Sequence, residues 1–228
     1  YTYRGINPYR NLEALLEKVK SLQPDLILAS GDLSEDGSED SYHLIRDLFD
    51  PLGVPVLALP GNHDDPALLA DAYPGSPVDS TQVTQHGSWQ IIRLNSCIPD
   101  NPCGRISEKP LSELERILAR DADQPSLVAV HHQPVMVGSP WIDKYRLLKP
   151  EPFLQLIDHY AAIKAVVWGH IHQVFETERP GTLMLGGPSS SINGIPGAEK
   201  FTPDTLGPAC RWLELRADGS LKSHIVSV

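Results

Sequence analysis

Residues 54–64 read VPVLALPGNHD: an apolar run, a turn, and then an asparagine beside a histidine. The apolar run is typical of a buried strand, and Pro60-Gly61 is typical of the turn that ends one. Asn62 and His63 would therefore stand at the carboxyl end of a strand, which is where ligands bind in open α/β sheets. An amide oxygen is a hard metal ligand, and an imidazole can bind a metal or move a proton. The stretch therefore predicts a functional site.

The same pattern recurs at three more strand ends. The apolar runs at 25–30, 126–130 and 163–168 are followed by Asp32, by His131-His132 and by His170-Ile171-His172. Parallel strands would bring these ends to one edge of a sheet. Carboxylate, amide and imidazole donors without a thiolate suit Mn, Fe or Zn rather than a cysteine-rich structural zinc site. A single histidine at a strand end is more often structural, but five or six such residues at four strand ends predict a metal centre.

The order of elements predicts a single α/β domain over residues 1–228. A helix after Asn7-Pro8, a strand at 25–30, a helix at 38–49 and a strand at 54–59 alternate as in βαβ units. Further on we expect a hairpin of 81–86 and 89–96, helices at 111–119 and 151–160, and strands at 126–130 and 163–168. The last part predicts strands at 174–177, 182–185, 210–216 and 221–226. Two loops remain, a long one at 135–150 near the site and a Ser-, Gly- and Pro-rich surface loop at 188–208.

Composition narrows the function classes. The 228 residues are 41% hydrophobic and 21% charged, which is typical of one folded globular domain. The net charge of −10 argues against a general nucleic-acid binder, although bound cations would still allow an anionic substrate. No apolar run reaches the roughly 20 residues that span a bilayer, and no signal peptide is visible. The odd count of 3 cysteines fits a reducing compartment, so we expect a cytoplasmic protein with no membrane partner.

Taken in order, the motifs resemble those of the calcineurin-like metallophosphoesterases. They are Gly31-Asp32, Gly61-Asn62-His63-Asp64, His131 and Gly169-His170-Ile171-His172. Finer features resemble the bacterial class III 3′,5′-cyclic AMP phosphodiesterases, namely 130–134, 138–143, 169–173 and 211–215. The resemblance covers the whole chain. It implies an α/β fold (α+β in some schemes), the four-layer αββα metallophosphoesterase sandwich.

One departure from the family pattern is large. The family begins with a strand that ends in Asp-x-His and supplies two ligands to the first metal ion, but nothing before Asn7 matches it. We therefore expect the first strand to be missing from this sequence. The resemblance implies a full ligand set for the second ion, which consists of Asp32, Asn62, His131 and His170. The first ion retains the bridging Asp32 and His172. Residues 189–208 match the cyclic-nucleotide subgroup less closely.

The resemblance also implies an activity, the hydrolysis of 3′,5′-cyclic AMP to 5′-AMP by two-metal activation of water. The ions would be Fe and/or Mn, with Zn as an alternative. His63 neighbours a ligand without being one and would protonate the leaving group. The candidate substrate contacts are Asn62, His63 and His132. For His132 a role in supporting the neighbouring ligand is the alternative. Asp36 and Asp64 are candidate supports of the site, although each also fits a solvated loop carboxylate.

Several alternatives remain open at this stage. Trp141 and Tyr145 could stack on a purine or close the site, or they could pack the long loop onto the domain or onto the partner of a homodimer. The substrate could be another phosphomonoester or phosphodiester, such as a phospholipid headgroup. A rival of another class is a non-catalytic chain that binds a single metal ion or a partner. Metal content separates these classes, because an enzyme of this kind needs two ions.

Overall fold

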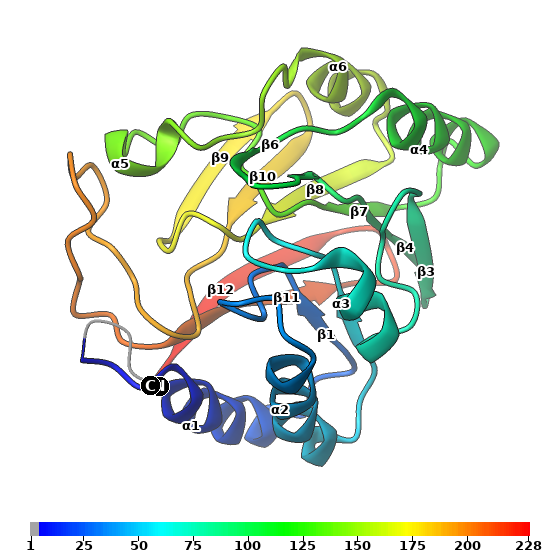
Figure 1. Cartoon of the computed structure of the whole chain (residues 1–228). Helices are drawn as coiled ribbons and strands as arrows, with labels where there is room; N and C mark the ends of the chain where they lie inside the picture. Colours follow the sequence, from blue (N-terminus) through cyan, green and yellow to red (C-terminus); the bar gives the residue numbers. More distant parts are fainter. Residues whose placement is uncertain (1–4) are drawn as a thin grey trace.

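Two layers of β-structure face each other between two layers of helices in the computed structural model, which describes residues 5–228 (Figure 1). The larger sheet has the strand order β3-β4-β7-β8-β10-β9. Its strands are β3 (Gln82–His86), β4 (Trp89–Arg93), β7 (Ser126–Ala129), β8 (Ile163–Trp168), β9 (Phe175–Arg179) and β10 (Thr182–Gly186). The four central strands are parallel, and β3 and β9 pair antiparallel at the two edges. The sheet is therefore mixed, with its parallel ends available for a site.

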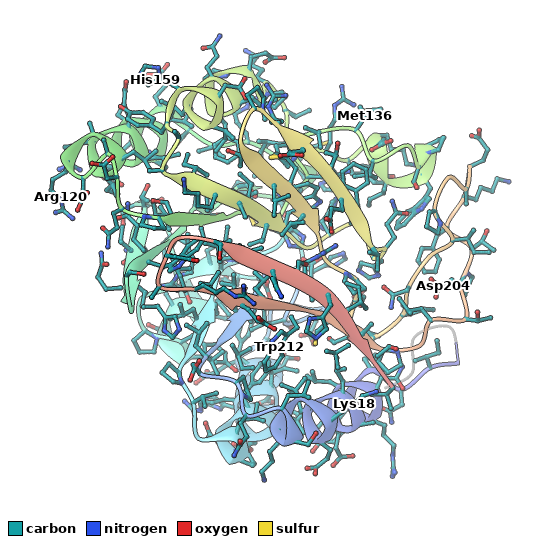
Figure 2. All side chains as sticks on the ribbon, turned by 180° about the vertical axis from the view of Figure 1, so that it is seen from behind. Lys18, Arg120, Met136, His159, Asp204 and Trp212 are labelled. Carbon is teal, nitrogen blue, oxygen red and sulfur yellow. The ribbon has the colours of Figure 1, made fainter. Side chains whose placement is uncertain are left out.

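The facing layer consists of two separate strand pairs. β1 (Ile27–Ala29) pairs in parallel with β2 (Val56–Ala58), and β11 (Ala209–Leu215) pairs antiparallel with β12 (Leu221–Ser227). Seen from behind, β11 and β12 lie between α1 and the larger sheet, with Trp212 on β11 (Figure 2). A small hairpin of β5 (Cys97–Ile98) and β6 (Asn101–Gly104) stands apart from both layers.

The helices cover the two outer faces. α1 (Pro8–Ser21), α2 (Glu39–Phe49) and α3 (Pro66–Ala72) lie against β1 and β2, and a short 3₁₀ helix (Asp50–Leu52) follows α2. α4 (Glu108–Arg120) and α6 (Glu151–His159) pack on the larger sheet. The four-residue helix α5 (Pro140–Asp143) lies within the long loop. This arrangement confirms the predicted four-layer αββα fold.

Apolar side chains of the described residues form four buried groups, and the three largest hold these layers together. Leu114, Leu118, Phe153 and Ile157 from α4 and α6 are buried against the outer face of the larger sheet. The inner face of that sheet meets β1, β2, β11 and β12 through a second buried group. A third group joins α1, α2 and α3 to β1 and β2. Burying both faces of the larger sheet explains why its central strands read as continuous apolar runs rather than as an alternation.

Local chemistry fixes where the first helices begin. Asn7 Oδ1 accepts a hydrogen bond from the N–H of Arg10, and Pro8 occupies the first helical position of α1. Ser38 caps α2 by accepting from the N–H of Ser41, so the helix begins one residue later than the pattern predicts. Asp65 caps α3 in the same way. These caps satisfy backbone donors that the first helical turn leaves free.

The structure departs from the predicted elements in a few places. β1 and β2 are shorter than the apolar runs at 25–30 and 54–59, because the residues at both ends of each run lie outside the strand pairing. α3, α5 and the β5–β6 hairpin were not predicted, since each is short and its apolar pattern is weak. The cysteines at 97, 103 and 210 are all free thiols. Among the described residues, no helix combines the length and the apolar character that crossing a bilayer requires.

A channel runs through the facing layer. Among the described strands, β1 pairs only with β2 and β11 only with β12. A cavity of about 1230 Å³ is lined by β1 and β11 and by apolar side chains of the larger sheet, including Ile91, Leu127 and Val167. The same cavity reaches Asp32, His131 and His172. The channel therefore connects the interior of the layer with the predicted site.

Candidate metal centre

The predicted ligands follow strands of two facing sheets. Asp32 and Asn62 come shortly after β1 and β2, whereas His131, His170 and His172 come after β7 and β8. The expectation of a single sheet edge is wrong, because β1 and β2 form a sheet of their own. The strand ends nevertheless meet. His131 Nε2 lies 3.1 Å from Asp32 Oδ2 and 3.1 Å from His170 Nδ1.

Backbone carbonyls orient three of the histidines. The ring N–H groups donate from His131 Nδ1 to Ser30 O (2.7 Å), from His170 Nε2 to Tyr145 O (3.2 Å) and from His172 Nδ1 to Ile192 O (2.9 Å). A hydrogen bond at one ring nitrogen assigns the proton to it and leaves the other nitrogen with a free lone pair. The nitrogens that can bind a metal ion are then Nε2 of His131, Nδ1 of His170 and Nε2 of His172.

This arrangement fits a metal ion. His131 Nε2 and His170 Nδ1 face each other at 3.1 Å, and the Asp32 carboxylate approaches the same point. A cation there would take the place of the proton that His131 Nε2 shares with Asp32 and would bind His170 Nδ1 as well. Asn62 Oδ1 is buried and has no hydrogen-bond partner among residues 5–228, which suits an oxygen reserved for a ligand. His131, His132 and His170 each place a ring nitrogen within 4.8 Å of the others, a grouping that could hold an ion.

The backbone at the site is strained. Asp32, His170 and His172 have φ angles of 54°, 62° and 48°, in the left-handed region that side chains other than glycine rarely adopt. Such conformations cost of order 1–3 kcal/mol each and persist where the surroundings impose them. Three strained residues among the predicted ligands indicate that the fold holds these side chains in place for a purpose other than stability.

The electrostatics pair the Asp32 carboxylate with His131 and keep His170 and His172 neutral. Burial acts to lower the pKa of His131, but the charge and hydrogen bond of Asp32 raise it. Burial acts to raise the pKa of Asp32, but the charge and hydrogen bond of His131 outweigh it and hold that pKa well below its usual range. Burial, reinforced by the neighbouring His131, lowers the pKa of His170 to about 3. Burial also lowers the pKa of His172. Neutral imidazole is the form that binds a metal, so His170 and His172 have the required protonation.

His63 lies beside this group and faces solvent. Its backbone N–H donates to Asp32 Oδ1 at 3.0 Å, which ties the Asn62-His63 loop to the predicted bridging carboxylate. Its side chain is 44% exposed, and its Nδ1 lies 3.9 Å from Glu35 Oε1. An exposed imidazole next to a carboxylate and next to the cluster can reach a bound substrate. The sequence did not single out Glu35, since it sits in an ordinary acidic loop.

His132 lies on the buried side of the cluster. Its side chain is fully buried, Nδ1 is 2.8 Å from Ser96 Oγ, and its ring centroid is 4.7 Å from that of His170. Burial lowers its pKa well below the ordinary value. A Cβ at Gly104 would come within 2.4 Å of the His132 ring, so the β5–β6 hairpin covers it closely. This placement favours the supporting role for His132 over substrate contact.

Asp64 and Asp36 have different places. The Asp64 carboxylate accepts hydrogen bonds from the N–H groups of Leu33, Ser34 and Gly61 and from the Tyr42 hydroxyl. It therefore joins the Asp32 loop to the Asn62-His63 loop, as a support of the site would. Asp36 is exposed and accepts from Ser34, Ser38 and Ser41, so it organises the turn before α2.

Gly61 allows the two loops to touch. A Cβ built on Gly61 would lie 2.1 Å from Asp32 Oδ1 and 2.4 Å from the Asp32 backbone nitrogen. We expect Gly61→Ala to displace Asp32 and to weaken Mn²⁺ binding by about tenfold or more, because ligand geometry sets metal affinity. Isothermal titration of Mn²⁺ into both proteins measures this effect. An unchanged affinity would contradict the assignment of Asp32 as a ligand.

The long loop supports the site with its backbone. Tyr145 contributes its carbonyl to His170, while its ring contacts the ammonium of Lys144 at 4.6 Å. The Trp141 ring packs edge-on against Phe201, with centroids 5.0 Å apart. The contacts of Trp141 therefore favour packing of the loop onto the domain over stacking on a purine. The supporting carbonyls of Ser30, Tyr145 and Ile192 carry no side-chain signal, so no sequence pattern marks them.

Comparisons with known proteins point to one family. The model of the calcineurin-like phosphoesterase family matches residues 5–174. The chain is 38% identical over 226 residues to the 3′,5′-cyclic adenosine monophosphate phosphodiesterase CpdA of Pseudomonas aeruginosa, covering 98% of this chain and 83% of that protein. It is 33% identical over 227 residues to a 3′,5′-cyclic-nucleotide phosphodiesterase of Nostoc, covering 99% and 85%. A dimetal phosphatase from Danio rerio has the same fold, with a TM-score of 0.69 at 14% identity over 96% of this chain and 88% of that one.

An αββα sandwich with a carboxylate and oriented imidazoles at its strand ends, together with the family match, places the chain among the metallophosphoesterases. The family match and the long relatives above 30% identity make the assignment more specific. The chain belongs to the calcineurin-like phosphoesterase family and is closely related to its cyclic-nucleotide phosphodiesterases.

Proposed function

We propose that this protein hydrolyses 3′,5′-cyclic AMP to 5′-AMP with two bound metal ions, Fe and/or Mn. The observation that carries the proposal is the position of His131 Nε2, which lies 3.1 Å from both Asp32 Oδ2 and His170 Nδ1. The chain is also related over nearly its whole length to cyclic AMP phosphodiesterases. When bound, such ions polarise phosphoryl oxygens and supply hydroxide near neutral pH. Asp32, Asn62, His131 and His170 would hold one ion, and Asp32 and His172 would contribute to the other.

The chain's own residues divide the remaining tasks. The Asn62-His63 loop, fixed to Asp32 by the 3.0 Å backbone hydrogen bond, places an exposed imidazole beside the ions. His63 would give its proton to the ribose oxygen as the ester bond breaks, a role worth about 10²–10⁴-fold. Glu35, 3.9 Å from His63 Nδ1, would orient the imidazole so that Nε2 faces the leaving group. Burial of His131 and His132 keeps water from the far side of the cluster.

The test is an assay of the purified protein after Mn²⁺ loading. Cyclic AMP, a phosphomonoester and a glycerophosphodiester are offered at equal concentration, and released phosphate or nucleotide is quantified. We expect 5′-AMP from cyclic AMP at the highest kcat/KM. Preference for either of the other substrates would replace the proposed substrate with another of the same family, and no turnover with metal bound would favour a binding protein.

The channel between β1 and β11 bears on the first ion. Asp32 and His172 give that ion two protein ligands, below the three of ordinary open catalytic sites. Among the described strands β1 pairs only with β2, and the channel that β1 lines also reaches Asp32 and His172. An added strand in this channel would pair with free strand edges and could deliver Asp-x-His side chains to the first ion.

We therefore expect a longer chain, extended before Tyr1 by a strand that ends in Asp-x-His, to bind the first Mn²⁺ about 100-fold more tightly, since loss of a supporting partner alone costs 10–100-fold. Residues 1–228 by themselves should hydrolyse cyclic AMP far more slowly. Mn²⁺ titration of both chains, followed by hydrolysis, measures the difference. Equal activity at equal metal would show that residues within 1–228, or a neighbouring copy, complete the site.

A further inference from the structure

We propose that Ser139 is a positioning residue for His172, acting through Gln173 and through the 188–208 loop. The proposal rests on the proposed metal site and adds a residue to it. Ser139 belongs to the Gly138–Asp143 stretch and Gln173 follows the His170-Ile171-His172 motif, and neither has a role in the chemistry described above. Both side chains are buried, Ser139 with 0% and Gln173 with 1% of its surface exposed.

The Ser139 hydroxyl joins two segments that both hold His172. It donates a hydrogen bond to Gln173 Oε1 at 2.9 Å and accepts one from the N–H of Gly197 at 2.8 Å. Gln173 is the next residue after His172 in the chain. Gly197 lies in the 188–208 loop, which also supplies Ile192 O to His172 Nδ1. One buried hydroxyl is thus linked to His172 along the chain and across the loop.

The Asp143 carboxylate holds the turn that contains Ser139. Asp143, 3% exposed, accepts hydrogen bonds from the N–H of Val137 at 2.8 Å and from the N–H of Ser139 at 3.0 Å. These bonds close the turn that leads into α5. Since the turn is pinned at two backbone donors, the hydroxyl of Ser139 has a defined place from which to act.

The 188–208 loop makes two further contacts near His172 and Ser139. The N–H of Gly194 donates to His172 O at 2.8 Å, and Phe201 packs on Trp141 two residues beyond Ser139. Figure 1 shows this loop running beside α5. The loop is therefore held against the 137–143 turn by an aromatic contact and by the Ser139 hydroxyl.

His172 needs this support because of its conformation. Its φ of 48° is unfavourable, and its Nδ1–H must stay on Ile192 O if Nε2 is to remain the free nitrogen. Removing the hydroxyl would leave the buried Gln173 Oε1 without this partner and would release the N–H of Gly197. The loop could then shift, and the Ile192 carbonyl with it, so that the ring of His172 would lose its fixed tautomer.

Ser139→Ala tests the proposal, with Ser126→Ala as the matched control. Ser126 is also fully buried and also makes two hydrogen bonds, to Gln124 O and from Gln90 Nε2, but it lies on β7 at the end away from the site. Mn²⁺ affinity is measured by isothermal titration on all proteins. The His172 tautomer is read from long-range ¹H–¹⁵N correlations of the metal-free proteins. Gln173→Leu serves as a second variant if Ser139→Ala does not fold.

We expect Ser139→Ala and Gln173→Leu to weaken Mn²⁺ binding about 10–100-fold, the range for partners that orient a ligand, and to replace the single Nδ1–H tautomer of His172 by an exchanging mixture. Ser126→Ala should change neither. Equal effects of Ser139→Ala and Ser126→Ala would overturn the proposal. If the parent protein binds no Mn²⁺ at all, the proposed function fails, while the tautomer of His172 still decides the role of Ser139.

Discussion

Asp32→Ala is expected to reduce bound Mn²⁺ by at least one ion per chain and to lower cyclic AMP turnover by about 10³-fold or more, because two-metal stabilisation supplies several kcal/mol. Asp32 is the only predicted ligand assigned to both ions. In the structure its carboxylate lies 3.1 Å from His131 Nε2 and also holds the N–H of His63 at 3.0 Å. Removing it therefore disturbs both the metal centre and the loop that carries the proposed acid.

The experiment combines metal analysis with kinetics. Bound metal is counted by elemental analysis after gel filtration, and turnover is measured over a range of Mn²⁺ concentrations. Asp158→Ala is a suitable control, because Asp158 is an exposed carboxylate on α6 whose partner is Arg179. A full complement of metal with normal turnover in Asp32→Ala would mean that the ions lie elsewhere in the protein.

The sequence predicted the position of each strand end well, because an apolar run followed by a turn is a local signal. The strand at 163–168 was predicted to the residue, and the structure has β8 at Ile163–Trp168. The gathering of Asp32, His131 and His170 could also be anticipated, since parallel strands carry their carboxyl ends in one direction. The division into two facing sheets could not, because strand pairing depends on contacts between residues far apart in the chain.

The supports of the site were much harder to predict. The carbonyls of Ser30, Tyr145 and Ile192 orient the three histidines, yet a carbonyl is present at every residue and leaves no trace in the sequence. The left-handed φ angles of His170 and His172 are equally hidden, as neither residue is glycine. Ser139 and Gln173 were visible only as parts of longer motifs. Their role depends on the 188–208 loop. Gly197 of that loop contacts Ser139 although more than fifty residues separate the two in the sequence.

His63→Ala is expected to keep the Mn²⁺ content of the parent protein and to lower turnover of cyclic AMP by about 10²–10⁴-fold. The reason is that the His63 side chain is 44% exposed and stands outside the group of ring nitrogens that His131, His132 and His170 form. Its loss should therefore remove a proton donor and leave the metal ligands in place. His43→Ala, which removes another exposed histidine on α2, is the control.

Two substrates with different leaving groups can show whether His63 acts as a proton donor or in another role. The ribose oxygen of cyclic AMP is a poor leaving group and needs a proton, whereas p-nitrophenolate leaves without one. We therefore expect His63→Ala to slow hydrolysis of bis(p-nitrophenyl) phosphate by less than about tenfold while it slows cyclic AMP hydrolysis in full. Glu35→Gln should follow the same pattern more weakly, since Glu35 acts only through its 3.9 Å contact with His63. Equal losses on both substrates would instead place His63 in substrate binding, and loss of metal would make it a ligand.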